Sequence, residues 1–487
     1  MGILSLLNIG RSGLLASQYS IETTGNNIAN ANNPDYHRQE VRLEDAIGID
    51  YAPGQLGTGV NATEVIQHFD LFIEKQYNSM SSAREMWKEV NTYLKGVEGL
   101  FENGEDGFSE VMSKFWQAWQ ELSMRPEDTS VRTALLGDAK NLTGLFNLID
   151  GEMQSEQDKM DKLIETDVSR VNEILTEIAD INHEINIHEE KGKNNANELR
   201  DKRTALVREL AEKMDINYID NGGGNVTITT TAGHTLVDGV KHFEIKFEGP
   251  KALSALTPGS SFTDSIYFEG SSDYELTVEV VTGGAADGTA QFKVSLDGGE
   301  TWLTDDDGNV QLFAANNYDN RIRIPGTDVA VWFGAVDDSQ TAASSNLSAG
   351  DSFTIVPKKG LYWYRNSSTA MNITPQFYTN GQANERRLTG GSITGFFNFR
   401  DNYGGKYREK FDALAKSLIW EVNRIHSEGA GLSKFTSATG TYEVDKTNTA
   451  LSGFATGLEF GDKLEAGNFN IYVYDNNGEL IARTCGF

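Results

Sequence analysis

Apolar residues at helical spacing open the chain. Between Ile3 and Asn30 a large aliphatic residue recurs every seven positions, at Leu7, Leu14, Ile21 and Ile28. This spacing places the four side chains on one side of a helix and is typical of a coiled-coil seam. A single amphipathic helix cannot cover its own stripe, so the pattern predicts a helix that needs a partner. Pro34 ends the helix because proline lacks an amide hydrogen.

Further helical periodicity appears in four stretches, 71–101 with 108–119, 154–189, 196–214 and 407–426. The stretch 154–189 is the longest periodic helix among them and carries one stripe, formed by Ile164, Val168, Val171, Leu175, Ile178 and Ile185, which predicts a coiled-coil arm. The glycine and asparagine run at 192–195 breaks it, so residues 196–214 are expected to return antiparallel to it.

The period changes from helical to two after Asn221, where Val226 and Ile228 alternate with threonine. Residues 243–357 are rich in threonine, glycine, aspartate and aromatic residues, which favours an inserted β-sandwich. The fold class expected is therefore multi-domain α+β, a long coiled-coil-like helical core with an amphipathic amino-terminal helix and inserted β-sandwich-like domains.

The predicted domains follow these changes of period. We expect an amino-terminal assembly helix that is disordered in the monomer, a helical core, a returning β/α segment, an inserted variable β domain and a partial β-rich module. Their ranges are 1–35, 36–220, 221–242 with 358–430, 243–357 and 431–487.

Charge narrows the possible partners. The 487 residues hold 71 acidic against 42 basic side chains, a net charge of -29, which repels nucleic acid and anionic lipid surfaces. Cys485 is the single cysteine, so no internal disulfide can form. The amino terminus lacks the features of a cleaved secretory signal, which predicts either a cytoplasmic protein or export by a route without one.

Candidate chemistry is sparse. His183 and His188 resemble a zinc motif but lie about 140° apart on a helix, so they cannot share one metal ion. One Asp-box pattern, Ser295, Asp297, Gly299 and Trp302, resembles the turn repeated in sialidases. A single copy without paired acids favours a structural hairpin. Gly390 to Thr394 misses a serine-hydrolase elbow and is expected to form a turn. No catalytic residue, metal site, cofactor or enzymatic activity is predicted.

The amino-terminal motifs resemble a known family. Ser12–Gln18 and Thr24–Pro34 are similar to the signature of axial flagellar rod, hook and junction proteins, and Asp35–Val41 resembles the FlgK-type junction branch. The likeness departs at Asp35 and His37, where that family more often has glycine and serine. Residues 196–203 and 390–401 also resemble FlgK-type segments.

The resemblance implies a structural subunit that joins hook to filament, self-assembles at the hook tip after type III export and lies outside the cell on the flagellum. Implied partners are further copies of itself, the hook protein, a second junction protein, flagellin, the export apparatus and its chaperone, with neither nucleic acid nor membrane. The family also has a carboxy-terminal helix that pairs with the first, so the ending at Phe487 predicts a truncated chain. The expected assembly interface comprises Leu7, Leu14, Gln18, Ile21, Asn26, Asn27, Ile28, Asn30, Asn33, Pro34, Tyr36 and Arg38.

Two alternatives stay open. The β insertion could bind glycans or a host surface while the rest displays it, or, less favoured, it could act as a sialidase-like enzyme. The role of residues 243–357 is not decided by the motifs.

Overall fold

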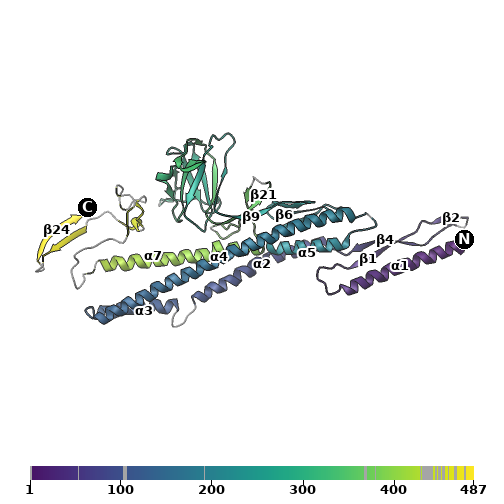
Figure 1. Ribbon diagram of the computed structural model, residues 1–487, viewed down its shortest axis with the longest axis horizontal. Coiled ribbons are helices and arrows are strands. Elements are labelled where there is room, and N and C mark those ends of the chain that lie inside the picture. The colour runs from purple at the N-terminus through teal and green to yellow at the C-terminus, as the bar shows by residue number, and fades with distance from the viewer. Residues whose placement is uncertain are drawn as a thin grey trace. The chain divides into compact units, whose positions relative to one another are not determined.

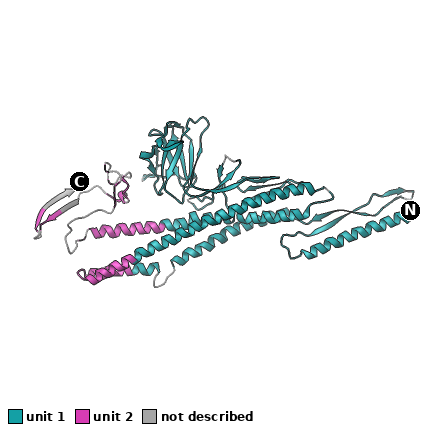
Figure 2. Cartoon of the chain, viewed as in Figure 1, with its two compact units in different colours: residues 1–113, 141–409 teal, residues 114–140, 410–487 magenta. Residues whose placement is uncertain are grey.

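The computed structural model describes the chain from residue 3 to residue 486. Left out within that range are residues 53, 102–106, 191, 306, 367–369, 379, 428, 430–441, 445–446, 448–450, 452–455, 459, 465–468 and 476–478. The chain divides into two compact units, residues 1–113 with 141–409 and residues 114–140 with 410–487 (Figure 2). Seven α-helices are described (Figure 1): α1 Ile3–Ala29, α2 Leu71–Leu100, α3 Phe108–Met124, α4 Thr129–His188, α5 Asn197–Lys213, α6 Gly391–Phe397 and α7 Gly405–Ser427.

The first unit begins with what we call the N-terminal arm, residues 3–68. Here α1 packs on an antiparallel pair of strands, β1 (Gln39–Asp45) and β4 (Val60–Gln67). A bulge interrupts their register between Arg42 and Leu43. The short strands β2 (Ile49–Tyr51) and β3 (Gly54–Leu56) pair with each other between β1 and β4. The four strands together form a long hairpin after α1.

The helical core of the first unit is organised by the stripe on α4. Ile164, Val171, Leu175, Ile178 and Ile185 are fully buried, which confirms that this stripe faces a core. The helix α5 runs antiparallel beside α4, as the pairs Arg170–Glu209 and Asn182–Arg203 show. Val207 and Leu210 of α5 are buried as well. The helix α4 begins at Thr129, well before the periodic stretch that predicts it. Its earlier turns contain Gly137, Gly144 and Gly151, and glycines inside a helical pattern weaken the prediction of a helix.

Small sheets cover this core. The strands β5 (Ile216–Asp220), β6 (Val226–Thr230), β7 (Thr235–Asp238) and β8 (Lys241–His242) form an antiparallel meander. The buried Arg203 of α5 ties it to the helices by donating to Asn182 Oδ1 and Gly224 O, both at 2.9 Å. A separate sheet joins β9 (Ile245–Glu248), β21 (Gly360–Tyr364) and β22 (Ala370–Asn372).

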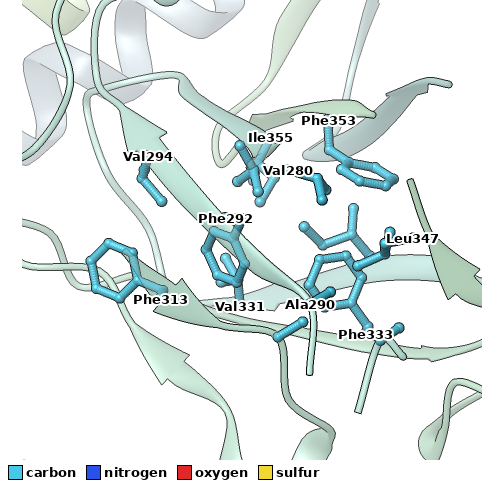
Figure 3. Packing of buried hydrophobic residues seen from close by; sticks show 14 of the residues in the cluster. Val280, Ala290, Phe292, Val294, Phe313, Val331, Phe333, Leu347, Phe353 and Ile355 are labelled. Carbon is cyan, nitrogen blue, oxygen red and sulfur yellow. The ribbon is translucent and has the colours of Figure 1, made fainter. Parts of the chain in front are cut away.

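The β-sandwich lies between β9 and β21 in the sequence. One sheet has the order β10 (Lys251–Ala255), β20 (Ser352–Val356), β12 (Leu276–Thr282), β14 (Gln291–Ser295), β15 (Phe313–Ala314). The other contains β11 (Ser265–Glu269), β17 (Ala330–Ala335), β16 (Ile322–Arg323) and β18 (Asp338–Ala342), and β13 (Gly284–Ala285) pairs with β19 (Asn346–Leu347). Phe292, Phe333 and Phe353 meet edge to face between the two sheets (Figure 3).

A glycine-rich segment corrects one expectation. Gly390 to Thr394 was expected to form a turn, but α6 begins at Gly391 and continues as a π-helix over Asn398–Gly404. The backbone of Gly391 has φ +83°, and a Cβ there would lie 2.3 Å from the Lys213 backbone. A Cβ on Gly395 would lie 2.7 Å from the Met86 carbonyl oxygen. The glycines therefore allow close helix packing, which sequence reasoning mistook for turn chemistry.

The second unit contains the end of α3, the start of α4, most of α7 and the hairpin of β23 (Phe469–Tyr474) and β24 (Leu480–Gly486). Phe115 is buried and meets Trp119 edge to face at 6.3 Å between ring centroids. Trp119 in turn meets His426 of α7 at 6.2 Å. These aromatic residues pack within the unit, while Trp116 is half exposed.

Asp351 joins two loops at one end of the sandwich. Its buried carboxylate accepts hydrogen bonds from the backbone amides of Thr257 (2.8 Å) and Ser348 (2.9 Å) and from the hydroxyls of Thr257 (2.7 Å) and Ser260 (2.6 Å). Burial acts to raise the pKa of Asp351, but the bonds from Ser260, Ser348 and Thr257 outweigh it and hold the pKa below its ordinary value.

We therefore expect Asp351→Asn to lower the free energy of unfolding of the full chain by about 1–3 kcal/mol at neutral pH, because donors on both loops lose their acceptor. Since the folded pKa is lowered, the carboxylate stabilises at neutral pH and that effect disappears as the pH falls through the folded pKa. The difference from wild type should thus shrink in strong acid. Thermal unfolding across pH measures this. The exposed Asp287→Asn is the control, and equal stability of the two variants would contradict the assignment.

Candidate assembly interface

The helix α1 has two faces of different chemistry. The face toward the hairpin consists of residues at helical spacing that are partly or fully covered, and apart from Ile9 they are small or polar: Ser5, Ser12, Gly13, Ala16, Ser20, Thr23 and Asn27. Small side chains let the helix lie close against β1 and β4. The predicted apolar seam lies elsewhere on the helix circumference.

Asn27 fastens α1 to the first strand. Its Nδ2 donates to Gln39 O at 2.8 Å, and its Oδ1 accepts from Gln39 N at 2.9 Å. The amide side chain thereby pairs with β1 as a neighbouring strand would. The Tyr36 hydroxyl adds a bond to the same Oδ1 at 2.8 Å. Burial, and then the negative charge of Asp201, raise the pKa of Tyr36, so its hydroxyl stays protonated and can donate.

A second fastening lies two turns from the start of the helix. Ser12 Oγ accepts from the Val60 amide at 3.2 Å and donates to Ile9 O at 2.9 Å. The preceding residue, Gly59, has φ +129°, and a Cβ there would lie 2.3 Å from Ser12 Oγ. Only glycine admits both this backbone conformation and this approach of the hairpin to the helix.

The seam itself is exposed. Leu7 is 64% exposed, Leu14 68%, and Ile21 and Ile28 are each 72% exposed. Ile3, Leu4 and Leu6 extend the apolar surface toward the first turn. The small residues that lie between the seam residues along α1, namely Gly10, Ser17 and Thr24, are exposed as well. Because their side chains are small, a second helix could approach α1 closely.

The arm has almost no core of its own. Among the described residues of the arm, only Ala16 is buried. Isolated soluble proteins seldom expose a contiguous apolar stripe of this size, so the seam is the candidate for an interaction surface.

The other predicted interface residues serve different local roles. Asn30 Nδ2 donates to Asn26 O and Oδ1, and Asn33 Oδ1 accepts from the Asp35 amide at 3.1 Å, so these asparagines shape the turn after α1. Pro34 accepts a bond at its carbonyl from Arg208 at 3.1 Å.

Gln18 and Arg38 lie on the surface of the arm. Gln18 bonds only locally in the described structure, donating to Glu22 at 2.9 Å. Arg38 joins an exposed cluster with Glu40 and His68. Neither residue fastens α1 to its hairpin.

Sequence reasoning missed a contact between residues that lie far apart along the chain. His37 Nδ1 lies 2.6 Å from Asp201 Oδ1 on α5, and Gln67 of β4 donates to the same oxygen. Burial raises the pKa of Asp201 above its ordinary value, against the opposite effect of the bonds from His37 and Gln67. The only sequence signal was that His37 departs from the family pattern, which pointed to no partner.

The Asp-box residues form a turn. Asp297 accepts at Oδ1 from Ser295 Oγ (2.8 Å) and the Thr301 amide (2.8 Å), and at Oδ2 from the Thr301 hydroxyl (2.7 Å). The amide of Gly299 donates to Ser295 Oγ at 2.9 Å. Lys293 covers the Trp302 ring with its Nζ 3.8 Å from the ring centroid. The carboxylate of this turn is thus committed to closing the hairpin.

The described residues contain no cluster of three or more His, Cys, Asp or Glu arranged to hold a metal ion. Nor does any helix in the described part of the chain have the length and apolar character needed to cross a membrane. His183 and His188 are both exposed on α4.

Comparison with known proteins agrees with the amino-terminal resemblance. The family model of the flagellar hook-associated protein FlgK helical domain matches residues 94–318. Flagellar hook-associated protein 1 of Bacillus subtilis is 28% identical over 267 residues, which are 53% of this chain and 51% of that protein. The protein of the same name from Salmonella typhimurium is 29% identical over 236 residues, 48% of this chain and 43% of that protein.

The chain spans about half the length of the curated relatives it matches. A solved structure, the flagellar hook junction protein FlgK from Burkholderia pseudomallei, aligns with a TM-score of 0.39 and 11% identity over 66% of this chain and 65% of that one. The family model and the curated relatives confirm the FlgK-type resemblance, and the chain's own helices and sheets confirm the α+β class.

We expect Asn27→Ala to loosen α1 from its hairpin, because the substitution leaves both backbone groups of Gln39 without their side-chain partner, at a local cost of about 1–3 kcal/mol. Hydrogen exchange of the β1 and α1 amides should accelerate roughly 5- to 100-fold if these amides exchange through opening of this contact. Exchange in α4 should not change. Gln18→Ala, on the same helix but away from the hairpin, is the matched control. Equal protection in the two variants would show that Asn27 does not hold the arm together.

Proposed function

We propose that this chain, a relative of the FlgK-type hook-associated proteins, is a structural subunit of the bacterial flagellum that joins hook to filament by self-assembly. The observation that supports this most directly is the exposed apolar seam of α1 on an arm that lacks a core. A second copy would cover the seam and supply the burial that the arm lacks alone.

The size of the exposed surface fits such an interface. Nine large apolar side chains of α1 are exposed: Ile3, Leu4, Leu6, Leu7, Leu14, Leu15, Tyr19, Ile21 and Ile28. Each offers on the order of 100 Å² of apolar area. Six of them share the face of the seam, namely Ile3, Leu6, Leu7, Leu14, Ile21 and Ile28, and together offer roughly 600 Å² of the roughly 800 Å² per partner that a stable interface buries.

Charge also favours contact through α1. The chain carries a net charge of -29, so two copies repel over most of their surface. The described α1 contains one basic residue, Arg11, and one acidic residue, Glu22. This helix is therefore a segment along which two acidic molecules can meet at little electrostatic cost.

The finer parts of the proposal follow from the family resemblance. The chain would leave the cell through the flagellar type III apparatus with its chaperone, then contact the hook protein on one side and a second junction protein and flagellin on the other. Its arm would gain an apolar core only when neighbours cover the seam, so that the full stability of the arm and assembly arise together. The role proposed is structural, without catalysis, cofactor, nucleic acid or membrane.

Leu14→Asp or Ile21→Asp should abolish incorporation into flagella, because a carboxylate in the covered seam would be buried without a partner. Since both positions are exposed in the single chain, its free energy of unfolding should change by no more than about 0.5 kcal/mol. Complementing a strain that lacks the gene, with immunoblots of purified hooks and electron microscopy, measures incorporation.

Asn8→Asp adds the same charge at an exposed position of α1 away from the seam and serves as the control. Normal filament attachment in the seam variants would exclude the seam as the assembly surface. Loss of attachment with Asn8→Asp as well would mean that any added charge is harmful.

The β-sandwich should be dispensable for attachment. Glu248 of β9 and Gly360 of β21 are paired neighbours, so the ends of the insertion lie next to each other. Replacing residues 250–357 by a short glycine and serine linker should therefore leave the helical core folded and hook attachment intact. Filament counts and circular dichroism test this, and adhesion assays on the same strain test the displayed-binder alternative. Loss of attachment by a folded deletion variant would assign the sandwich an assembly role.

A further inference from the structure

A cavity of about 210 Å³ lies within the first unit, where the β-sandwich joins the helical core. Three segments far apart in the sequence line it: the loop 272–275 before β12, the segment 374–378 after β22 and residues 400–402 of the π-helix. The lining residues are distinct from those of the assembly interface. The cavity is therefore a feature that the proposed junction role does not use.

Two glycines let these segments lie close together. A Cβ on Gly405, the first residue of α7, would lie 2.1 Å from Oδ2 of Asp273 in the loop before β12. A Cβ on Gly298 of the Asp-box turn, where φ is +76°, would lie 2.7 Å from Oε1 of Gln376. A side chain at either glycine would displace Asp273 or Gln376, so the glycines keep both residues in place on the cavity wall.

The charges on the cavity wall balance. The wall has three acidic and three basic residues: Asp273, Glu275, Asp401, Lys358, Arg400 and Lys406. Asp273 forms an ion pair with Lys358, and Arg400 donates to Asp401 at 2.7 Å. Glu275 accepts from Arg387 at 2.7 Å. Since the two signs are equal in number and largely paired, the wall favours neither a cation nor an anion, and a matching ligand is uncharged.

One buried donor on the wall has no partner. Gln376 is 8% exposed, and its Oε1 accepts from Asn384 Nδ2 at 2.9 Å, which fixes the orientation of the side-chain amide. Its Nε2 donates to no described residue. Because buried polar groups are normally hydrogen-bonded, this nitrogen calls for an acceptor that the described chain does not supply.

Aromatic side chains form another part of the wall. Tyr274, Phe377 and Tyr378 are half-buried and line the cavity. Flat apolar faces beside an amide donor suit a ring that carries C–H groups on one face and hydroxyls at its edge. The space is sufficient for such a ring, because a cavity of about 150 Å³ holds benzene.

We propose that this cavity binds one neutral sugar unit, with Gln376 Nε2 donating to a hydroxyl oxygen and Tyr378 packing against the ring. The π-helix supports a binding role, because such wide turns occur frequently at functional sites. The site is separate from the carboxylate of the Asp-box turn, which closes its own hairpin. Binding at this site goes beyond the junction role and is a property of the single chain.

Saturation-transfer NMR of the full chain with glucose, galactose, mannose and N-acetylglucosamine tests the site. We expect at least one of these sugars to bind with a dissociation constant on the order of 1 mM, because a single small ring offers few contacts. N-acetylneuraminic acid carries a negative charge, and the chain has a net charge of -29. It should therefore bind about tenfold more weakly or not at all.

Variants locate the sugar. Gln376→Glu keeps the acceptor for Asn384 but removes the amide donor, so it should weaken binding by about tenfold. Gln382→Glu makes the same exchange at an exposed position that does not line the cavity, and it is the matched control. Tyr378→Ala removes an aromatic face at a half-buried position and should also weaken binding, which keeps the test decisive if Gln376→Glu fails to fold.

Three results would overturn the inference. Saturation transfer to none of the four sugars would leave water as the occupant of the cavity. Binding that neither Gln376→Glu nor Tyr378→Ala weakens would place the sugar elsewhere on the chain. A preference for N-acetylneuraminic acid would contradict the argument from balanced charge. These outcomes do not bear on hook attachment, which the seam variants test separately.

Discussion

The structure depends on how α1 divides its circumference between a face that packs on its own hairpin and a face that stays exposed. Its small and polar face is committed to the hairpin, where the Asn27 amide takes the place of a strand and Ser12 fits against Gly59. That commitment turns Leu7, Leu14, Ile21 and Ile28 away from the molecule. Had α1 used its apolar seam to bind its own hairpin, the arm would have a core and no surface for another chain.

The same separation of roles appears in the core. Apolar burial is concentrated on α4 and α5 and between the two sheets of the sandwich, where side chains such as Ile178 and Phe292 are fully covered. Joints between parts are polar instead, as at Asp201 and Arg208. The parts are thus individually firm, because apolar packing holds each one. These polar contacts fix the direction of the parts more than they contribute stability.

Sequence reasoning predicted the secondary structure correctly in segments where apolar residues follow one period, helical or alternating. The heptads of α1 and the long stripe of α4 predicted both helices, and the alternation after Asn221 predicted the change to strands. It also assigned the seam, because four aliphatic residues at one spacing need no knowledge of tertiary contacts. It failed at Gly391 and Gly395, because a short glycine-rich pattern is compatible both with a turn and with close helix packing. In this chain the two glycines serve helix packing. The pair of His37 and Asp201 could not be found, because the two residues are 164 positions apart and neither belongs to a periodic pattern.

The pairing of β9 with β21 has a consequence for how the chain can change over time. Because the polypeptide leaves the core and re-enters it on adjacent strands, anything inserted there closes a loop whose ends are already held together. The entropy of closing a longer loop rises only slowly with its length, so an enlarged, shortened or exchanged insert adds little strain to the helices. The β-sandwich can therefore change in length or sequence without straining the helical core to which both of its ends return.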